Sequence, residues 1–206
     1  TFFAWLVTRT DLPYKGFMKV MFLVPFMLPS FIGALAWKML LSPRSGYINQ
    51  FFMDLGFDGP IFNIYSYAGI MAVETMYLFP FVFIQVCGAL ERMDPTLEES
   101  ARGASLFTIT RKITIPLVMP SILSGALLIM LYSMAHFGTV AVLGVENGIF
   151  NIPTLIYERI HQSAGSFEAI RTGTVLATVL VFTAALIIWL QNKILNKGRF
   201  QIIAGK

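Results

Sequence analysis

Charged side chains and cysteine are scarce in this chain of 206 residues. Charged residues make up 13% of it, about half of the roughly 25% that soluble domains carry. That composition excludes a disordered chain and a nucleic-acid-binding module, and it argues against a water-soluble globule. The single cysteine, Cys87, excludes an internal disulfide and any multi-thiolate metal site. Because the only histidines are His136 and His161, we predict no metal centre.

Hydrophobic residues are abundant instead. They make up 56% of the chain, and the mean hydropathy is +0.72, as in a polytopic membrane protein. A membrane-spanning helix needs about 20 mostly apolar residues. Stretches with few or no charges therefore predict one all-α integral membrane domain over 1–206, with complete spans at 17–41, 66–90, 117–143 and 172–194. The short apolar run at 1–8 is interpreted as the end of an earlier, truncated helix.

The basic residues assign each loop to one side of the membrane. Most Lys and Arg residues lie in 9–19, in 91–116 and from 193 onward. Four spans place these three segments on the same side, which the positive-inside rule identifies as the cytoplasm. The loops near 42–65 and 144–171 are then expected to face outward.

The longest polar stretch between two spans on the inner side is Glu91–Pro116. Asp94 and Pro95 are typical of a helix start, as N-cap and first helical residue, and Gly103 is expected to interrupt the helix. We predict a short helix, a break at Gly103 and a second helix that enters the bilayer at Pro116. A short amphipathic helix projecting from a bundle has nothing of its own to pack on, so this loop predicts a partner.

At this loop the sequence resembles the EAA loop of the permease subunits of bacterial ABC importers. The step of 13 residues from Gly103 to Pro116 fits that family. Fewer residues than in the family separate Glu99 from Gly103, which makes the first coupling helix short. The positions that the resemblance implies for contact with the ATPase are Glu98, Glu99, Ala101, Gly103, Ala104, Ser105 and Pro116.

The resemblance implies a MetI-like core of five helices in a multi-pass protein of the bacterial inner membrane. It implies three protein partners besides membrane lipid: ABC ATPase subunits, a second permease half (fused or separate) and an extracytoplasmic solute-binding protein. ATP and Mg would bind to the ATPase chain. This chain would be a non-enzymatic transport subunit with no catalytic residue, no cofactor and no nucleic-acid partner.

Two sequence segments outside the loop indicate which solute is carried. Arg9–Pro13 and Phe137–Gly144 resemble the amino-terminal half of the fused permeases of the ferric-iron import subfamily. Ferric iron or a related small solute is therefore expected. Thiamine, phosphonate and polyamine importers are relatives of this subfamily, and they remain alternatives.

Glu74 and His136 lie inside predicted spans. An intramembrane carboxylate costs about 2.5–3.5 kcal/mol or more, and by default it marks a solute pathway or a buried pair. Both residues are candidates for the translocation path, and the alternative is structural hydrogen bonding.

Two other functional classes remain open on the sequence. An ion-coupled secondary transporter would need intramembrane charges for its coupling ion, and only Glu74 and His136 are available. An integral-membrane enzyme would need a cluster of polar catalytic residues near one interface, and the sequence shows no such cluster.

Overall fold

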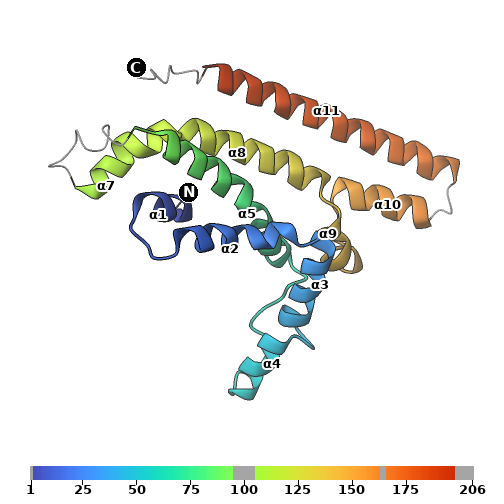
Figure 1. Cartoon of the computed structure of the whole chain (residues 1–206). Coiled ribbons are helices and arrows are strands. Elements are labelled where there is room, and N and C mark those ends of the chain that lie inside the picture. Colours follow the sequence, from blue (N-terminus) through green and yellow to red (C-terminus); the bar gives the residue numbers. More distant parts are fainter. Residues whose placement is uncertain (1, 95–104, 163–165, 198–206) are drawn as a thin grey trace. The chain divides into compact units, whose positions relative to one another are not determined.

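The computed structural model describes residues 2–94, 105–162 and 166–197, and every regular element in these ranges is helical (Figure 1). Three of the described helical segments are long and apolar enough to cross a membrane: Tyr67–Arg92, Thr110–Ala135 and Phe167–Lys193. A bent pair, Lys15–Met27 with Ser30–Leu41, adds a fourth if it counts as one span. The all-α membrane class expected from composition is confirmed.

The first described range contains one long helix and four shorter ones. They are α1 (Phe2–Arg9), α2 (Lys15–Met27), α3 (Ser30–Leu41), α4 (Tyr47–Asp54) and α5 (Tyr67–Arg92). The span expected at 66–90 coincides closely with α5. The span expected at 17–41 is divided between α2 and α3, whose axes differ by 94°.

Pro29 explains that division. Proline has no N–H to continue the helical pattern, and it disfavours helical geometry in the residue before it, Leu28. Pro29 itself has ψ near 130°, an extended conformation, and α3 begins at the next residue. Pro25, by contrast, lies inside α2 without ending it.

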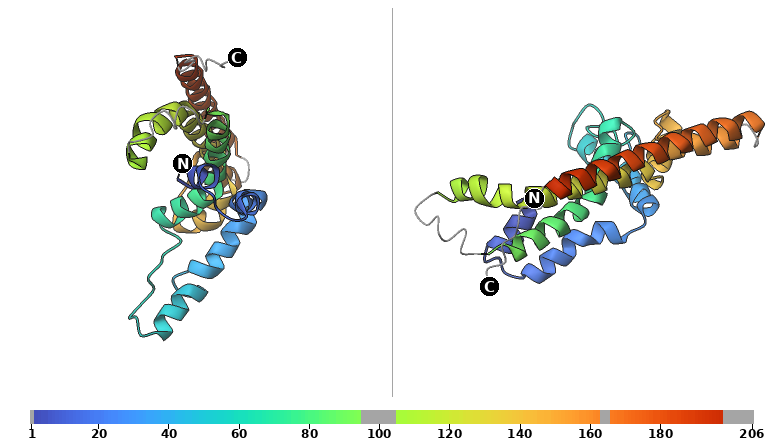
Figure 2. Two further views of the ribbon diagram at one scale, coloured as in Figure 1. Left: turned by 60° about the vertical axis from the view of Figure 1, so that its left-hand side comes forward. Right: turned by 90° about the horizontal axis from the view of Figure 1, so that it is seen from above.

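The second half of the described chain begins with an unbroken helical run. Its elements are α7 (Leu106–Ile109), the π-helix η1 (Thr110–Thr114), α8 (Ile115–Ala135), α9 (Gly138–Leu143), the 3₁₀ turn η2 (Val145–Asn147), α10 (Ile152–Gln162) and α11 (Phe167–Lys197). The helix expected over 117–143 stops at Ala135, and a break at His136 and Phe137 separates it from α9. Figure 2 shows α11 as one uninterrupted helix, longer at its amino end than the expected 172–194.

The described chain folds into two compact units. Of the described residues, one unit comprises 2–22, 80–94, 105–131 and 184–197, and the other comprises 23–79, 132–162 and 166–183. Because α2, α5, α8 and α11 each contribute residues to both units, neither unit is a separate stretch of sequence. The organisation as one permease domain stays a prediction.

Small apolar contacts build the first unit. Phe22 packs between Phe3 and Phe83, with ring centroids 4.9 and 5.1 Å apart. At Gly125 a side chain would approach Val82 to 3.0 Å, so this glycine lets α8 come close to α5. Lys19 and Glu91 form an ion pair at the ends of α2 and α5.

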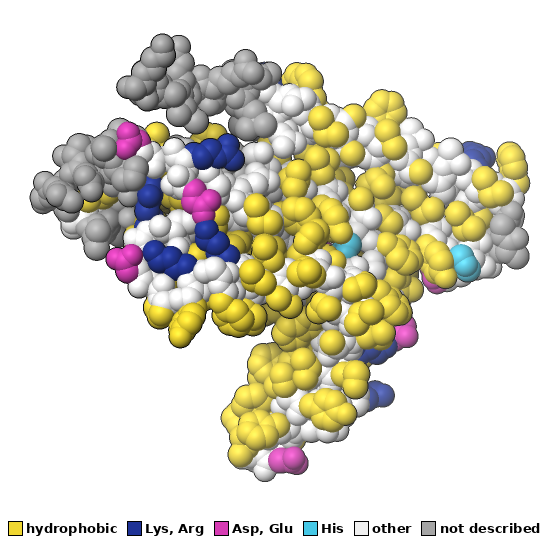
Figure 3. Space-filling view, in the orientation of Figure 1, with side chains coloured by type: hydrophobic (Ala, Val, Ile, Leu, Met, Phe, Trp, Pro, Cys, Tyr) yellow, Lys and Arg dark blue, Asp and Glu magenta, His cyan; other side chains and the backbone are white. Residues whose placement is uncertain are grey.

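The core of the second unit lies between α3, α5 and α9. Its buried residues are Ala34, Ile64, Ile70, Val73, Val140, Val142 and Leu143. Elsewhere large hydrophobic side chains are widely exposed, including Phe182 on α11, which is 72% exposed. On the face shown in Figure 3, hydrophobic side chains cover α3 and α4, and Lys and Arg side chains gather near α1 and the start of α2. An apolar exterior of this kind suits the hydrocarbon core of a lipid bilayer.

Candidate functional site

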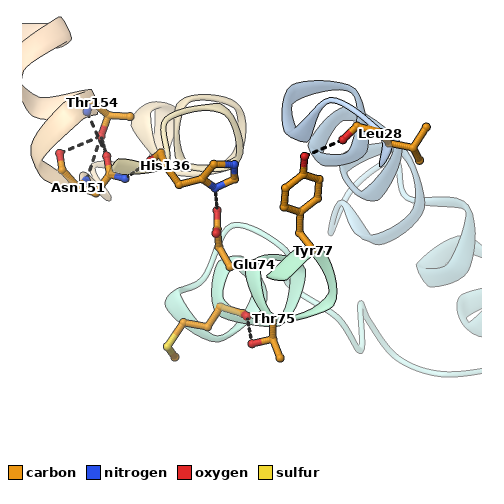
Figure 4. Close-up of polar contacts among 8 residues, drawn as sticks. Leu28, Glu74, Thr75, Tyr77, His136, Asn151 and Thr154 are labelled. Atoms are coloured by element: carbon orange, nitrogen blue, oxygen red, sulfur yellow. Dashed lines mark hydrogen bonds and ion pairs between the residues drawn. The ribbon is translucent and has the colours of Figure 1, made fainter. Parts of the chain in front are cut away.

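Glu74 and His136 form a buried polar pair in the second unit (Figure 4). Glu74 lies on α5, and His136 lies in the break between α8 and α9. Their atoms Oε1 and Nδ1 are 2.5 Å apart, and the two side chains are 13% and 7% exposed. The sequence identified both residues separately, and the structure brings them together across 62 positions of the chain.

Aromatic rings surround the imidazole. Tyr77 stacks on it with centroids 5.4 Å apart and planes inclined by 19°, and the Tyr132 ring lies at the same distance. Tyr77 follows Glu74 by three positions on α5, so both side chains lie on one face of that helix. Hydrophobicity alone did not single out these tyrosines among the aromatic residues of the chain.

Asn151 fixes the main chain of His136. Its Nδ2 donates to the His136 carbonyl oxygen, while its Oδ1 accepts from the Thr154 N–H at 3.1 Å. The second contact makes Asn151 the N-cap of α10, and the fully buried Thr154 returns a hydroxyl hydrogen bond to Asn151 Oδ1 at 2.8 Å. Sequence reasoning missed Asn151, although an Asn followed by Pro153 is a helix-start signal.

The pair leaves two buried polar atoms without a hydrogen-bond partner among the described residues: Glu74 Oε2 and His136 Nε2. An ionised carboxylate only accepts hydrogen bonds, so with Glu74 ionised and His136 neutral the Nδ1–H of His136 donates to it and Nε2 keeps its lone pair. Both remaining atoms are then acceptors. Such an arrangement suits a hydrogen-bond donor or a cation.

The described residues contain no group of three or more His, Cys, Asp and Glu side chains that could hold a metal ion. The Glu74–His136 pair by itself supplies two ligand atoms, fewer than the four or more that protein metal sites take. In the described part of the chain, the chemistry of the pair is therefore that of hydrogen bonding and charge.

The predicted coupling loop is described only in part. Glu98, Glu99, Ala101, Gly103 and Ala104 lie outside the described residues. Ser105 is exposed, and its hydroxyl oxygen accepts from the N–H of Thr108 at 3.3 Å, which caps α7.

Pro116 is the second residue of α8. The N–H of Ile115 donates to the carbonyl of Thr110, five residues back, as in a π-helix. The helical run from Leu106 therefore continues through Pro116 into α8 without a gap.

Comparison with known proteins places this arrangement in a family. Residues 2–200 match the family described as binding-protein-dependent transport system inner membrane component. The spermidine/putrescine transport system permease protein PotB of Escherichia coli (strain K12) is 28% identical over 198 residues, which cover 95% of this chain and 71% of that protein. The molybdenum transport system permease protein ModB of the same strain is 28% identical over 194 residues, which cover 92% of this chain and 82% of that one.

A solved structure shares the fold. It is the crystal structure of a bacterial alginate ABC transporter in complex with an alginate pentasaccharide-bound periplasmic protein. The TM-score is 0.74 with 20% sequence identity, over 93% of this chain and 69% of the matched chain.

These similarities confirm the expected MetI-like permease fold and the location in the inner membrane as a multi-pass protein. These relatives are named for polyamines and molybdenum, so the expected ferric-iron solute is not shown. The chain belongs to the family of binding-protein-dependent transport system inner membrane components, the permease subunits of ABC importers.

Proposed function

We propose that this permease carries a cationic solute past the Glu74–His136 pair. Among cations, a polyamine of the spermidine and putrescine class fits this pair best. The observation that supports this proposal is the pair of buried polar atoms, Glu74 Oε2 and His136 Nε2, which have no protein partner among the described residues and are both acceptors when His136 is neutral. An ammonium group supplies N–H donors and positive charge to both atoms. The faces of Tyr77 and Tyr132 also favour a cation over an anion.

The same pair argues against the anions that other relatives are named for. Molybdate and the carboxylates of alginate carry negative charge, and a carboxylate in a poorly hydrated site repels them more strongly than in water. Glu74 is only 13% exposed, so water screens it little. Its charge therefore favours the polyamine relatives over the oxyanion relatives as guides to the solute.

Ferric iron is the second candidate, because Arg9–Pro13 and Phe137–Gly144 resemble the fused ferric-iron permeases. Iron is a cation too, but it prefers several oxygen or nitrogen ligands at once. Among His, Cys, Asp and Glu side chains, the described residues offer only Glu74 and His136 at this place. A polyamine, which needs hydrogen bonds rather than a full coordination shell, fits the pair better.

ATP hydrolysis is proposed to occur in a partner chain. An ABC ATPase that binds ATP and Mg would dock on the loop at 91–116, and an extracytoplasmic binding protein would deliver solute to the outer loops. A second permease half, fused or separate, would complete the path. ATP binding shifts the permease between conformations only through contacts that differ between them, and typical coupling energies are about 1–3 kcal/mol.

Solute uptake into proteoliposomes tests the cationic path. With the assembled importer, we expect ATP-dependent uptake of labelled spermidine and none of molybdate. Changing Glu74 to Gln removes the charge and keeps the size, and it is expected to lower the maximal rate of spermidine uptake about tenfold, or about 1.4 kcal/mol. Glu158→Gln, on the exposed side of α10, is the matched control and should leave uptake unchanged.

Uptake of ferric ion instead of spermidine would favour the second candidate. Uptake of molybdate, or full spermidine uptake by Glu74→Gln, would contradict a cationic path through this pair. Uptake driven by an ion gradient without any ATPase would support a secondary transporter and contradict the ABC mechanism.

Crosslinking tests the coupling loop. We expect a cysteine at Ala104 to crosslink to the ATPase subunit, and Gly103→Trp to leave ATP hydrolysis intact while uptake stops. Asp54→Cys, in the loop assigned to the outer side, should give no such crosslink. Failure of both the Ala104 and the Gly103 expectations would contradict docking at this loop.

A further inference from the structure

Tyr77 contacts two separate helix breaks of the second unit. Its hydroxyl donates to the carbonyl oxygen of Leu28 at 2.8 Å, in the break between α2 and α3. Its ring stacks on His136, in the break between α8 and α9. Figure 4 shows the side chain reaching from α5 toward Leu28 on one side, with His136 on the other.

The Leu28 carbonyl needs such a partner. The last carbonyls of a helix have no partner within it, and Leu28 follows the last residue of α2. The contact is exposed in the structure, and a carbonyl exposed to hydrocarbon has no water to bond with. The Tyr77 hydroxyl therefore satisfies a group that the 94° bend between α2 and α3 exposes.

The two breaks also touch directly. A side chain at Gly138, the first residue of α9, would lie 3.0 Å from the Phe31 nitrogen and closer still to the Ser30 hydroxyl. Only a glycine allows α9 to start this near the start of α3. A further link, the ion pair of Lys38 and Glu146 at 3.3 Å, is exposed, and such pairs contribute little.

From these contacts we infer that Tyr77 is a positioning residue for transport, which holds the α2–α3 break against the α8–α9 break so that the two bends move as one body. The hydroxyl secures the first break and the ring secures the second. If either contact is lost, only the packing of α3 on α9 still joins the two bends, they are held together less rigidly, and part of the conformational change driven by ATP no longer reaches the solute path. This role does not depend on which solute is carried.

The test uses the assembled importer in proteoliposomes and in nanodiscs. Tyr77→Phe keeps the ring against His136 and removes only the hydroxyl. A hydrogen bond contributes a net of about 0.5–1.5 kcal/mol, so we expect solute transported per ATP hydrolysed to fall about 3- to 10-fold. Tyr67→Phe, on an exposed tyrosine at the start of the same helix, should leave that ratio unchanged.

Spin labels report the motion itself. Labels on cysteines at Met39 of α3 and at Asn147, just after α9, are expected to give one narrow distance distribution in the nucleotide-free and ATP-bound states of the wild type. Cys87→Ala provides the background. In Tyr77→Phe the distribution should broaden or gain a second population.

Three results would overturn the inference. In the first, the wild-type distance itself changes between nucleotide states, so that the bends move independently. In the second, Tyr77→Phe has a narrow distribution and an unchanged ratio of transport to hydrolysis. In the third, Tyr77→Phe lowers thermal stability, uptake and ATP hydrolysis in parallel while the distance stays narrow, as a merely structural residue would.

Discussion

At the scale of single residues, Asn49 holds together the segment between α3 and α5. It is fully buried, donates from Nδ2 to the carbonyls of Leu41, Ser42 and Phe62, and accepts from the Phe62 N–H at 2.9 Å. Asn49→Ala removes this partner from the Phe62 N–H and from the Leu41 and Phe62 carbonyls, at about 1–3 kcal/mol for each group that water cannot reach, while the Ser42 carbonyl keeps its bond from the Gly46 N–H. We expect a lower thermal unfolding midpoint and roughly tenfold faster amide exchange at Phe62.

Asn63→Ala is the comparison for that change. Asn63 is exposed and makes a single side-chain contact of this kind, accepting from the Tyr65 N–H at 3.0 Å. Its replacement should shift neither the unfolding midpoint nor exchange at Phe62. Equal effects of the two substitutions would mean that the Asn49 contacts contribute little to stability.

At the scale of elements, the packing of α3 on α9 depends on Gly138. Gly138→Ala places a methyl group against Ser30 and the Phe31 backbone, and overpacking of this kind costs about 1–3 kcal/mol. We expect lower thermal stability and slower uptake. Adding Ser30→Gly removes the nearest obstacle and should restore part of the loss, so that the two changes are not additive.

Gly33→Ala supplies the control on the same helix pair. Nothing lies within 4 Å of a side chain added at Gly33, and alanine favours a helix by up to about 1 kcal/mol over glycine. Its stability should be unchanged or higher. A Gly138→Ala protein as stable as Gly33→Ala would show that α9 does not approach α3 this closely.

At the scale of the whole molecule, the sidedness of the loops can be measured. Ser105 lies just before α7 in the loop assigned to the cytoplasm, and Asp58 lies between α4 and α5 in the loop assigned to the outside. Both are exposed. A cysteine at Asp58 is expected to react with a membrane-impermeant maleimide in intact spheroplasts, and one at Ser105 only in inverted vesicles.

The native cysteine controls that labelling. Cys87 is 7% exposed within α5, so the parent protein should react in neither preparation. Labelling of Ser105→Cys from the outside would reverse the orientation that the basic residues predict, and it would remove the basis for ATPase docking at 91–116.

Much of the fold could be predicted from the sequence because a bilayer constrains a chain locally. The stretch at 66–90 is apolar over a full span, and it is helical in the structure as α5. Breaks that depend on distant partners could not be predicted in this way. α8 ends at Ala135 where Asn151, fifteen positions beyond His136, takes the His136 carbonyl as its hydrogen-bond acceptor.

The candidate site, too, could be predicted from the sequence only in part. Glu74 and His136 were recognisable one at a time, because polar side chains are rare inside apolar spans. Their contact could not be recognised in the sequence. The roles of Tyr77 and Asn151 could not be recognised either, because nothing in the sequence shows which of the tyrosines and asparagines contact His136.

By itself, the sequence determined a multi-pass helical membrane protein and the polar residues within its spans, because the cost of placing charge or unpaired backbone in hydrocarbon acts on each segment alone. Only the tertiary structure decided that Tyr77 satisfies the Leu28 carbonyl and that Glu74 faces His136. A hydrogen bond depends on distance and direction between groups far apart in the chain, and those are set when the helices pack.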